Sequence, residues 1–509
     1  MQLCCPRCQT TVESDVMVSA EAPICAHCGG RLGLPISQAA LDHVFSEHHY
    51  APLLTSELFP PSSQAFASAP VRENAVTHIT RGTAHAAKGE LDRALVEFQA
   101  AIECDPRSAL AYNNRGYLFM LRKEYDRALA DFNITIELDR HFATAFNNRG
   151  FVWIAKKDYD QAIMDCDRAI QLDPTIALAH HNRGFALAAQ GHCERAISDF
   201  NAALLLDPKL PNVLQNRGAA YISIGEFDKA IADFDATLRL QSDNPFAFFN
   251  RAFVHVIKGD LGLAAHDLDD AIRCRSDYAN AYYLRGDLNR LQNDYDRAIE
   301  DFSAALTCNP RFALCLYRRG ECHFEKGAVE LAVFDFSALI DLEPNSPAAF
   351  NNRGLAYAGL NDHDSAIADY DEAIRLDPRY ARAFHQRAIS NAARHEFEAA
   401  TVDHIEALRL GLTASEAYRD FAQLWSTSSD SRFRDGGLAI ELAREACELS
   451  GWEDWTCLRT LAAAYAEFGQ VDEAIQWAEK AQMLASHDFR MLCANDLEHY
   501  RRQKLGITM

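Results

Sequence analysis

Small and apolar residues recur along the chain with a fixed period of 34 residues from Ala75 onward. Within each unit, small or apolar residues fall at positions 4, 8 and 11 and again at 20, 24 and 27–28, which is the spacing of one helix face. Position 15 is Gly or Asn in seven units, and both residues tolerate the left-handed backbone that ends a helix. Position 32 is Pro in six units, which stops a second helix. Each unit is therefore predicted to be a helix, a tight turn and an antiparallel helix.

Ten units keep this period without slippage. Position 20 is Ala in every unit, position 8 is Gly in eight units and Ala in two, and position 24 is usually aromatic. The small residues let the two helices approach closely, and a single hairpin cannot bury its own apolar stripe, so neighbouring hairpins must stack. The units begin at Ala75, Ala109, Ala143, Ala177, Pro211, Pro245, Ala279, Ala313, Pro347 and Ala381.

This pattern of Gly at 8, Ala at 20, an aromatic at 24 and Pro at 32 resembles the tetratricopeptide repeat. The resemblance implies an all-α fold, a right-handed superhelical solenoid of antiparallel helix hairpins. It also implies that the first helices line a concave groove, with positions 2, 5, 6, 9, 12 and 13 facing that groove.

Outside the ten units at 75–414 the pattern changes at both ends. Residues 1–34 hold two Cys-x-x-Cys pairs, and residues 35–74, rich in Pro and Ser, are predicted to be a linker with a short amphipathic piece around Leu41–Phe45. Residues 415–489 hold two degenerate units with an insertion near 428–435, and residues 490–509 are predicted to form a capping helix and tail. The run from Leu438 onward resembles C-terminal segments of bacterial tetratricopeptide proteins.

Four N-terminal cysteines have the spacing of zinc ligands, because two Cys-x-x-Cys pairs are separated by 16 residues. Four thiolates suit one tetrahedral zinc ion, and a site closed by four cysteines is structural rather than catalytic. The segment resembles a small β-rich zinc ribbon, with strands expected at Thr10–Val12 and Val16–Ser19. A redox switch that uses the same thiols is the alternative. The expected ligands are Cys5, Cys8, Cys25 and Cys28.

The chain carries a formal net charge of −22, which disfavours nucleic acid as its main partner. Its 15 cysteines are odd in number, and most are scattered singly through helical pattern, which argues against a disulfide framework and for a reducing compartment. The N-terminus does not have the pattern of a signal peptide, and no stretch approaches the ~18 apolar residues of a membrane span. A cytoplasmic protein that does not enter membranes is therefore expected.

Position 7 is Arg and position 23 is acidic in all ten units. In a hairpin that turns near position 15 these two positions are equidistant from the turn, so they should face each other. A ladder of charged ligand contacts is one interpretation, but the constant presence of both partners favours an ion pair within each hairpin. The structural pairs expected are Arg115 with Asp131, Arg149 with Asp165, Arg183 with Asp199 and Arg217 with Asp233.

Asparagine recurs at position 6, which the resemblance places on the groove. An amide both donates and accepts hydrogen bonds, so a row of amides suits the backbone of an extended peptide. The row resembles the asparagine ladder of O-linked N-acetylglucosamine transferase, although asparagine at this position is also common in the family for reasons unrelated to binding. The predicted groove residues are Asn114, Asn148, Asn182, Asn216, Asn250 and Asn352, with Phe249 and Tyr283 as aromatic contacts.

The sequence shows none of the motifs G-x-x-x-x-G-K-S/T, H-E-x-x-H and G-x-S-x-G, so it nominates no catalytic site. We therefore expect a non-enzymatic scaffold that binds extended segments of partner proteins, with the zinc ribbon as an accessory docking module. A nucleic-acid-associated regulator tethered through the ribbon and a thiol-based zinc sensor are the alternatives.

Overall fold

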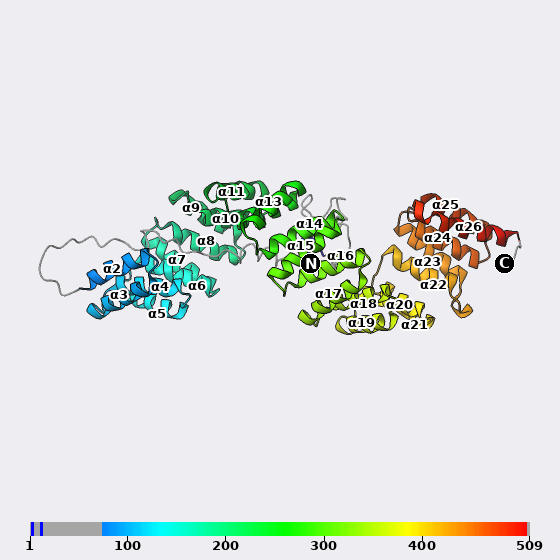
Figure 1. The fold of residues 1–509 in the computed structure, drawn as a ribbon, viewed down its shortest axis with the longest axis horizontal. Coiled ribbons are helices and arrows are strands. Elements are labelled where there is room, and N and C mark those ends of the chain that lie inside the picture. The colour runs from blue at the N-terminus through cyan, green and yellow to red at the C-terminus, as the bar shows by residue number, and fades with distance from the viewer. Residues whose placement is uncertain (1, 5–10, 14–73, 506–509) are drawn as a thin grey trace. The chain divides into compact units, whose positions relative to one another are not determined.

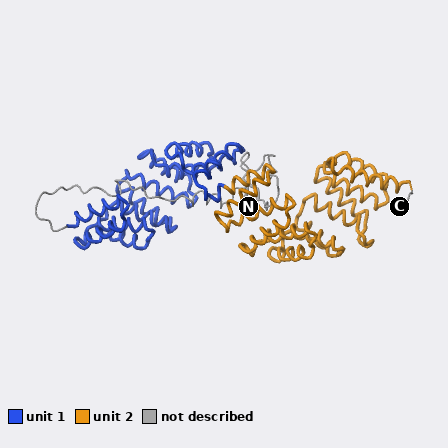
Figure 2. The backbone as a smooth tube through the Cα atoms, in the orientation of Figure 1, with its two compact units in different colours: residues 1–281 blue, residues 282–509 orange. Residues whose placement is uncertain are grey.

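The computed structural model describes residues 2–4, 11–13 and 74–505 (Figure 1). The chain divides into two compact units, residues 1–281 and 282–509 (Figure 2). Residues 74–505 form twenty-five α-helices, so the predicted all-α repeat solenoid is confirmed for this part of the chain.

The first unit is a series of helix hairpins, in which a helix A at positions 1–13 of the 34-residue unit is followed by a helix B at positions 17–30. Its helices are α2 (Ala75–Ala87), α3 (Leu91–Cys104), α4 (Ala109–Leu121), α5 (Tyr125–Leu138), α6 (Ala143–Ala155), α7 (Tyr159–Leu172), α8 (Ala177–Ala189), α9 (Cys193–Leu206), α10 (Pro211–Ser223), α11 (Phe227–Leu240), α12 (Pro245–Lys258) and α13 (Leu261–Cys274).

The second unit continues the hairpin pattern and then departs from it after α21. Its helices are α14 (Ala279–Leu291, which begins at the end of the first unit), α15 (Tyr295–Cys308), α16 (Ala313–Glu325), α17 (Val329–Leu342), α18 (Pro347–Gly359), α19 (His363–Leu376), α20 (Ala381–Ala393), α21 (Phe397–Arg409), α22 (Ser415–Thr427), α23 (Gly436–Leu449), α24 (Trp455–Glu467), α25 (Val471–Leu484) and α26 (Arg490–Lys504), with 3₁₀ turns η1 (Ser431–Phe433) and η2 (His487–Phe489).

The turn inside each of the ten regular hairpins has the same backbone shape. Position 15 has a positive φ in all ten, including the units where Lys123, Lys157 or His395 stands in place of Gly or Asn. The turn geometry is therefore set by the hairpin as a whole, and Gly or Asn only lowers the cost of adopting it.

Inside each hairpin the closest approach joins positions 8 and 24. A Cβ added to Gly218 would lie 2.7 Å from Cε1 of Phe234, so only glycine lets the ring lie flat on helix A. Ala252 and Ala388 replace this glycine in two units, where position 24 is Leu268 or His404 rather than a phenylalanine. In the described hairpins every six-membered ring at position 24 thus faces a glycine, whereas Gly150 faces the smaller Cys166.

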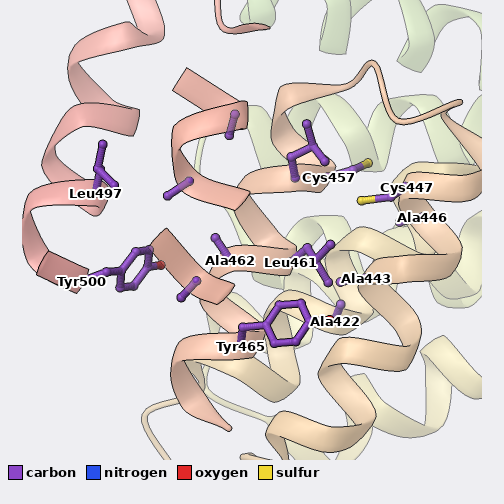
Figure 3. Packing of buried hydrophobic residues seen from close by; sticks show 14 residues of the cluster. Ala422, Ala443, Ala446, Cys447, Cys457, Leu461, Ala462, Tyr465, Leu497 and Tyr500 are labelled. Atoms are coloured by element: carbon purple, nitrogen blue, oxygen red, sulfur yellow. The ribbon is translucent and has the colours of Figure 1, made fainter. Parts of the chain in front are cut away.

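The C-terminal helices α22–α26 share one buried cluster (Figure 3). Leu461 and Tyr465 of α24 lie at its centre, and α26 adds Leu497 and Tyr500. Helix α26 therefore covers apolar surface that the last hairpin would otherwise expose.

The N-terminal segment is described only as a pair of short strands. Strand β1 (Gln2–Cys4) pairs antiparallel with β2 (Thr11–Glu13). The strand expected at Thr10–Val12 thus corresponds to β2, whereas β1 was not predicted and Val16–Ser19 lies outside the described residues. The predicted β-rich zinc ribbon is not supported by these strands alone. Its four cysteines and the predicted linker up to residue 73 also lie outside the described residues.

Candidate functional site

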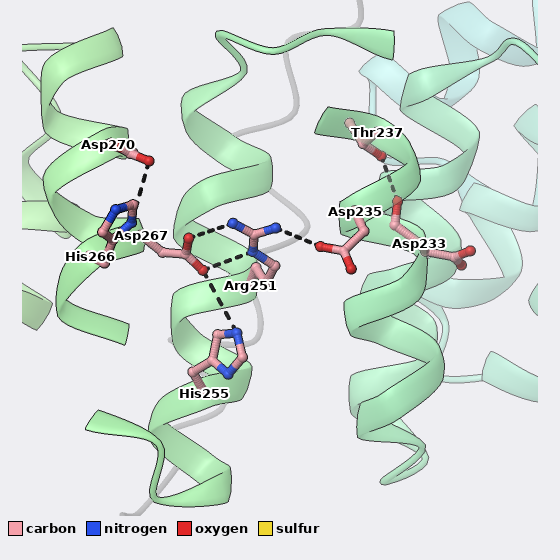
Figure 4. Close-up of polar contacts among 8 residues, drawn as sticks. All are labelled: Asp233, Asp235, Thr237, Arg251, His255, His266, Asp267 and Asp270. Carbon is pink, nitrogen blue, oxygen red and sulfur yellow. Dashed lines mark hydrogen bonds and ion pairs between the residues drawn. The ribbon is translucent and has the colours of Figure 1, made fainter. Parts of the chain in front are cut away.

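The arginine at position 7 donates two hydrogen bonds to the acid at position 23 of its own hairpin. Arg251 donates from Nε to Oδ2 of Asp267 at 2.8 Å and from Nη2 to Oδ1 at 2.6 Å (Figure 4). The same fork joins Arg115 to Asp131, Arg149 to Asp165, Arg183 to Asp199 and Arg217 to Asp233. Such bidentate pairs are directional and strong, so each one fixes helix A against helix B.

The same arginine also reaches the preceding hairpin. Arg251 donates from Nη1 to Asp235 at 2.5 Å, and Asp235 is position 25 of the unit before (Figure 4). Seven further arginines make the equivalent contact, to Gln99, Asn133, Asp167, Asn201, Ser303, Ser337 and Asp371. The row is therefore a lattice that links hairpins as well as stabilising each one, and this second contact was not predicted from the sequence.

In these pairs, the hydrogen bonds between opposite charges and the burial of the groups shift the pKa of each group in opposite directions. Hydrogen bonds from Arg183 to Asp199 raise the pKa of the guanidinium, against the effect of its burial. Burial raises the pKa of Asp233, and the hydrogen bond from Arg217 opposes this shift. Asp233 is the more buried partner, with 7% of its side chain exposed against 20% for Arg217, so desolvation acts mainly on the acid.

A second row of contacts joins the A helices of neighbouring hairpins, and we call it the polar seam. Here the side chain at position 6 of one hairpin meets the side chain at position 5 of the hairpin before it. The donor and acceptor pairs are Asn148 to Asn113 at 3.3 Å, Asn182 to Asn147 at 2.9 Å and Asn216 to Nε2 of His181 at 2.9 Å.

The exposure expected of a ligand-binding row is not found at position 6. The six asparagines predicted to face the groove are between 1% and 6% exposed, and three of them, Asn148, Asn182 and Asn216, bond to the neighbouring A helix. Four buried amide atoms among the described residues have no hydrogen-bond partner: Oδ1 of Asn182, Asn216 and Asn351, and Nδ2 of Asn250. The six asparagines at position 6 are Asn114, Asn148, Asn182, Asn216, Asn250 and Asn352.

The predicted aromatic contacts are half-buried and lie in ring clusters within their own units. In the first unit, the ring of Phe249 lies 5.2 Å from that of Tyr278. In the second unit, Tyr283 lies 5.2 Å from Phe312, and burial raises its pKa. Both rings therefore contribute to packing, and each keeps part of its surface accessible.

Charged residues replace the amides in part of the second unit. Arg318 stands at position 6 and donates to Glu321 at 2.8 Å, while Arg290 donates to Asp287 at 2.8 Å. Nε of Arg318 lies 3.8 Å from Asp287, so the four groups form one cluster across α14 and α16. The cluster balances two cations with two anions and does not favour a ligand of either sign.

Between residues 74 and 505, no helix has both the length and the apolar character needed to cross a bilayer.

Family models match much of the region of regular hairpins. One tetratricopeptide repeat model matches residues 143–176, 279–312 and 347–380, and two further tetratricopeptide repeat models match residues 182–245 and 314–346. A TPR repeat model matches residues 82–122. The three segments matched by the first model begin at Ala143, Ala279 and Pro347, which are unit boundaries predicted from the 34-residue period.

Comparison with solved structures gives three examples of similar chains. YrrB, described as a TPR protein with an unusual peptide-binding site, is 25% identical, covers 37% of this chain and 97% of its own, and has a TM-score of 0.32. Yeast Tom70 is 14% identical, covers 84% and 96%, and has a TM-score of 0.33. The APC/C hetero-tetramer Cut9-Hcn1 is 12% identical, covers 84% and 96%, and has a TM-score of 0.45.

A comparison with curated proteins gives no match. The family-model matches and the hairpins agree on one repeat and one register. The segments that these models match, between residues 82 and 380, are therefore tetratricopeptide repeats.

Proposed function

We propose that the protein is a non-enzymatic scaffold that binds extended segments of partner proteins along the A helices of its first unit. The observation that carries the proposal is the polar seam. Its hydrogen bonds hold successive A helices side by side, so any position of helix A is repeated at a regular interval along one face. A surface that repeats in this way suits a ligand that is itself extended and repetitive, such as a peptide backbone.

Side chains at position 9 supply the contact surface. Position 9 lies one helical turn beyond position 6 and therefore on the same side of helix A. Phe151, Phe185 and Phe253 occupy it and are half-buried. Because the amides of the polar seam are buried, these rings rather than the amides offer the contact surface, and that contact is apolar. This chemistry suits a largely apolar segment of a partner rather than a strongly charged one.

The proposal is tested by crosslinked capture of partners from a native extract. The variant Phe151→Ala/Phe185→Ala is compared with Met164→Ala, whose side chain on α7 is 64% exposed and lies on helix B. Circular dichroism first establishes that both variants fold. Partners that disappear from the double variant and persist with Met164→Ala support binding on helix A, whereas equal capture by both variants would rule this surface out.

We also propose that Cys5, Cys8, Cys25 and Cys28 hold one structural zinc ion, and that this module is an accessory docking site. These cysteines lie outside the described residues, and the proposal is supported by their spacing and by the pairing of β1 with β2 on either side of Cys5 and Cys8 in the sequence.

Metal analysis of the purified full chain tests the zinc proposal. One zinc ion per chain is expected, lost in Cys25→Ser/Cys28→Ser and kept in the control Cys193→Ser, a free cysteine of the helical array. A zinc-free wild-type chain, or zinc retained by the double variant, would contradict the proposal.

A further inference from the structure

A cavity of about 700 Å³ lies in the second unit, where the ten regular hairpins end. Its lining comes from α19, α20, the turn that leads into α21, the first two turns of α21 and the 3₁₀ turn η1 with Asp430 before it. A volume of this size is typical of a ligand pocket. The cavity shares no residue with the polar seam.

An insertion in the repeat builds one wall of the cavity. Helix α22 ends at Thr427, and the chain then makes η1 before Asp435 returns to bond through its backbone N–H to the carbonyl of Trp425 at 3.0 Å. This path puts the ring of Phe433 5.9 Å from Phe397 and 6.2 Å from Trp425. The regular 34-residue unit has no counterpart of η1, so the wall that Phe433 forms is added by the insertion.

The arginine lattice ends at the same place. Arg387 bonds to Asp403 and to Asp371, as its equivalents do in earlier hairpins. The next hairpin has Phe421 at position 7 instead of Arg, and position 25 before it is Ile405 instead of a polar residue. The row of position-7 arginines therefore ends at Arg387.

The charge of the lining is negative. Five carboxylates and two guanidinium groups line the cavity. Arg387 pairs with both Asp371 and Asp403, Arg432 pairs with Asp430, and Arg394 beside the cavity pairs with Glu396, so the acids still outnumber the arginines. Asp403 is saturated by Arg387 and by Nδ2 of Asn391, so it forms part of the floor. Glu398 is exposed at the rim.

The apolar part of the lining suits the stem of a long cationic side chain. Ile367, Val402 and the rings of Phe397 and Phe433 line the cavity beside the acids. Arg and Lys carry a flexible apolar stem below a charged head, and their heads also bind to aromatic faces. A simple anion would meet a surplus of carboxylates here.

We propose that this cavity is a second docking site, which takes an arginine or lysine side chain from a segment of a partner protein. The stem lies along Val402 beside the touching rings of Phe397 and Phe433, and the charged head is held near Glu398. The site is independent of the helix A surface proposed above, so either can fail without the other.

The probe is a fluorescein-labelled peptide, Gly-Leu-Arg-Leu-Arg-Leu-Gly, whose binding to the full chain is followed by fluorescence polarisation. A matched peptide carries citrulline, which keeps the shape of arginine and removes its charge. We expect the citrulline peptide to bind at least about tenfold more weakly.

Two variants locate the binding. Glu398→Gln should weaken binding of the arginine peptide about threefold, as expected for an exposed ion pair. Phe433→Ala should weaken binding of both peptides because it removes one wall of the cavity. The control is Glu330→Gln, since Glu330 occupies the same repeat position, 18, two hairpins earlier and is also exposed.

We expect Glu398→Gln to lose affinity for the arginine peptide and Glu330→Gln to keep it. Equal binding of the two peptides, equal effects of the two glutamine variants, or no binding of the arginine peptide would each overturn the proposal. Because Glu398→Gln leaves the aromatic wall intact, it tests whether Glu398 holds the charged head even if Phe433→Ala disturbs the insertion.

Discussion

Asn182 donates from Nδ2 to Oδ1 of Asn147 at 2.9 Å, across the boundary between two stacked hairpins. Both side chains are 3% exposed. An amide in this situation has a definite partner before any ligand arrives, so its first contribution is to the stacking of the hairpins.

Replacing Asn182 with Ala is therefore expected to lower the stability of the first unit. The change leaves the buried Oδ1 of Asn147 without its donor, which costs about 1–3 kcal/mol. Urea unfolding followed by circular dichroism measures the loss, and Gln161→Ala, an exposed amide on α7, serves as the control with little change. Unchanged stability together with lost partner capture would instead assign Asn182 to ligand binding.

Asp233→Ala is expected to destabilise the chain without selectively abolishing one partner. The change removes both hydrogen bonds to Arg217 and leaves a half-buried guanidinium without its acid, at a cost of about 3 kcal/mol. Asp235→Ala is the matched control, because Asp235 is 39% exposed and bonds to the next arginine from the surface, where a pair contributes at most about 1 kcal/mol. Thermal unfolding of the two variants should differ clearly, and equal melting temperatures would argue against a structural role for the buried pair.

The hairpins and the facing of positions 7 and 23 could be predicted because both follow from periodicity inside one unit. The contact from Arg251 to Asp235 crosses into the neighbouring unit, so it depends on how hairpins stack, which the 34-residue period does not specify. A signal was nevertheless present: position 25 is polar in the nine units followed by an arginine, and becomes Ile405 before Phe421.

The burial of the side chain at position 6 was harder to predict than the face of helix A on which it lies. The resemblance placed position 6 on one face of helix A, but whether Asn148 is exposed there depends on the distance between neighbouring A helices. In the structure this distance allows a hydrogen bond to Asn113 and leaves the amide buried. Likewise, the insertion near 428–435 was visible as extra length, whereas the contact of Phe433 with Phe397 follows from a turn that no repeat pattern describes.

Gly218→Ala should test the size rule between positions 8 and 24. The added Cβ would meet the ring of Phe234 at 2.7 Å, and overpacking of this kind costs about 1–3 kcal/mol. The compensating variant is Gly218→Ala/Phe234→Leu, which copies the natural pair Ala252 and Leu268. Unfolding of the single variants and the double variant gives a coupling energy, and simple additivity of the two changes would contradict the rule.

His404 should make the second unit sensitive to acid. The imidazole stacks on Phe421 at 4.9 Å, and burial, with a further contribution from His385, lowers its pKa to about 3. The unfolded chain takes up this proton near pH 6.5 and the native chain does not, so stability falls as pH drops below 6.5, by about 2 kcal/mol between pH 7 and pH 5.

His404→Leu should remove that part of the pH dependence, because leucine is the residue that accompanies Ala at position 8 in the hairpin of Ala252. Phenylalanine would be the wrong choice, since in the other hairpins a six-membered ring at position 24 always faces a glycine at position 8, and here that position is Ala388. The measurement is urea unfolding at pH 7 and pH 5, with His141→Leu as the control at an exposed histidine. If His404→Leu loses as much stability on acidification as the wild type does, the buried imidazole is not the group responsible, and His385 beside Asp420 becomes the next residue to change.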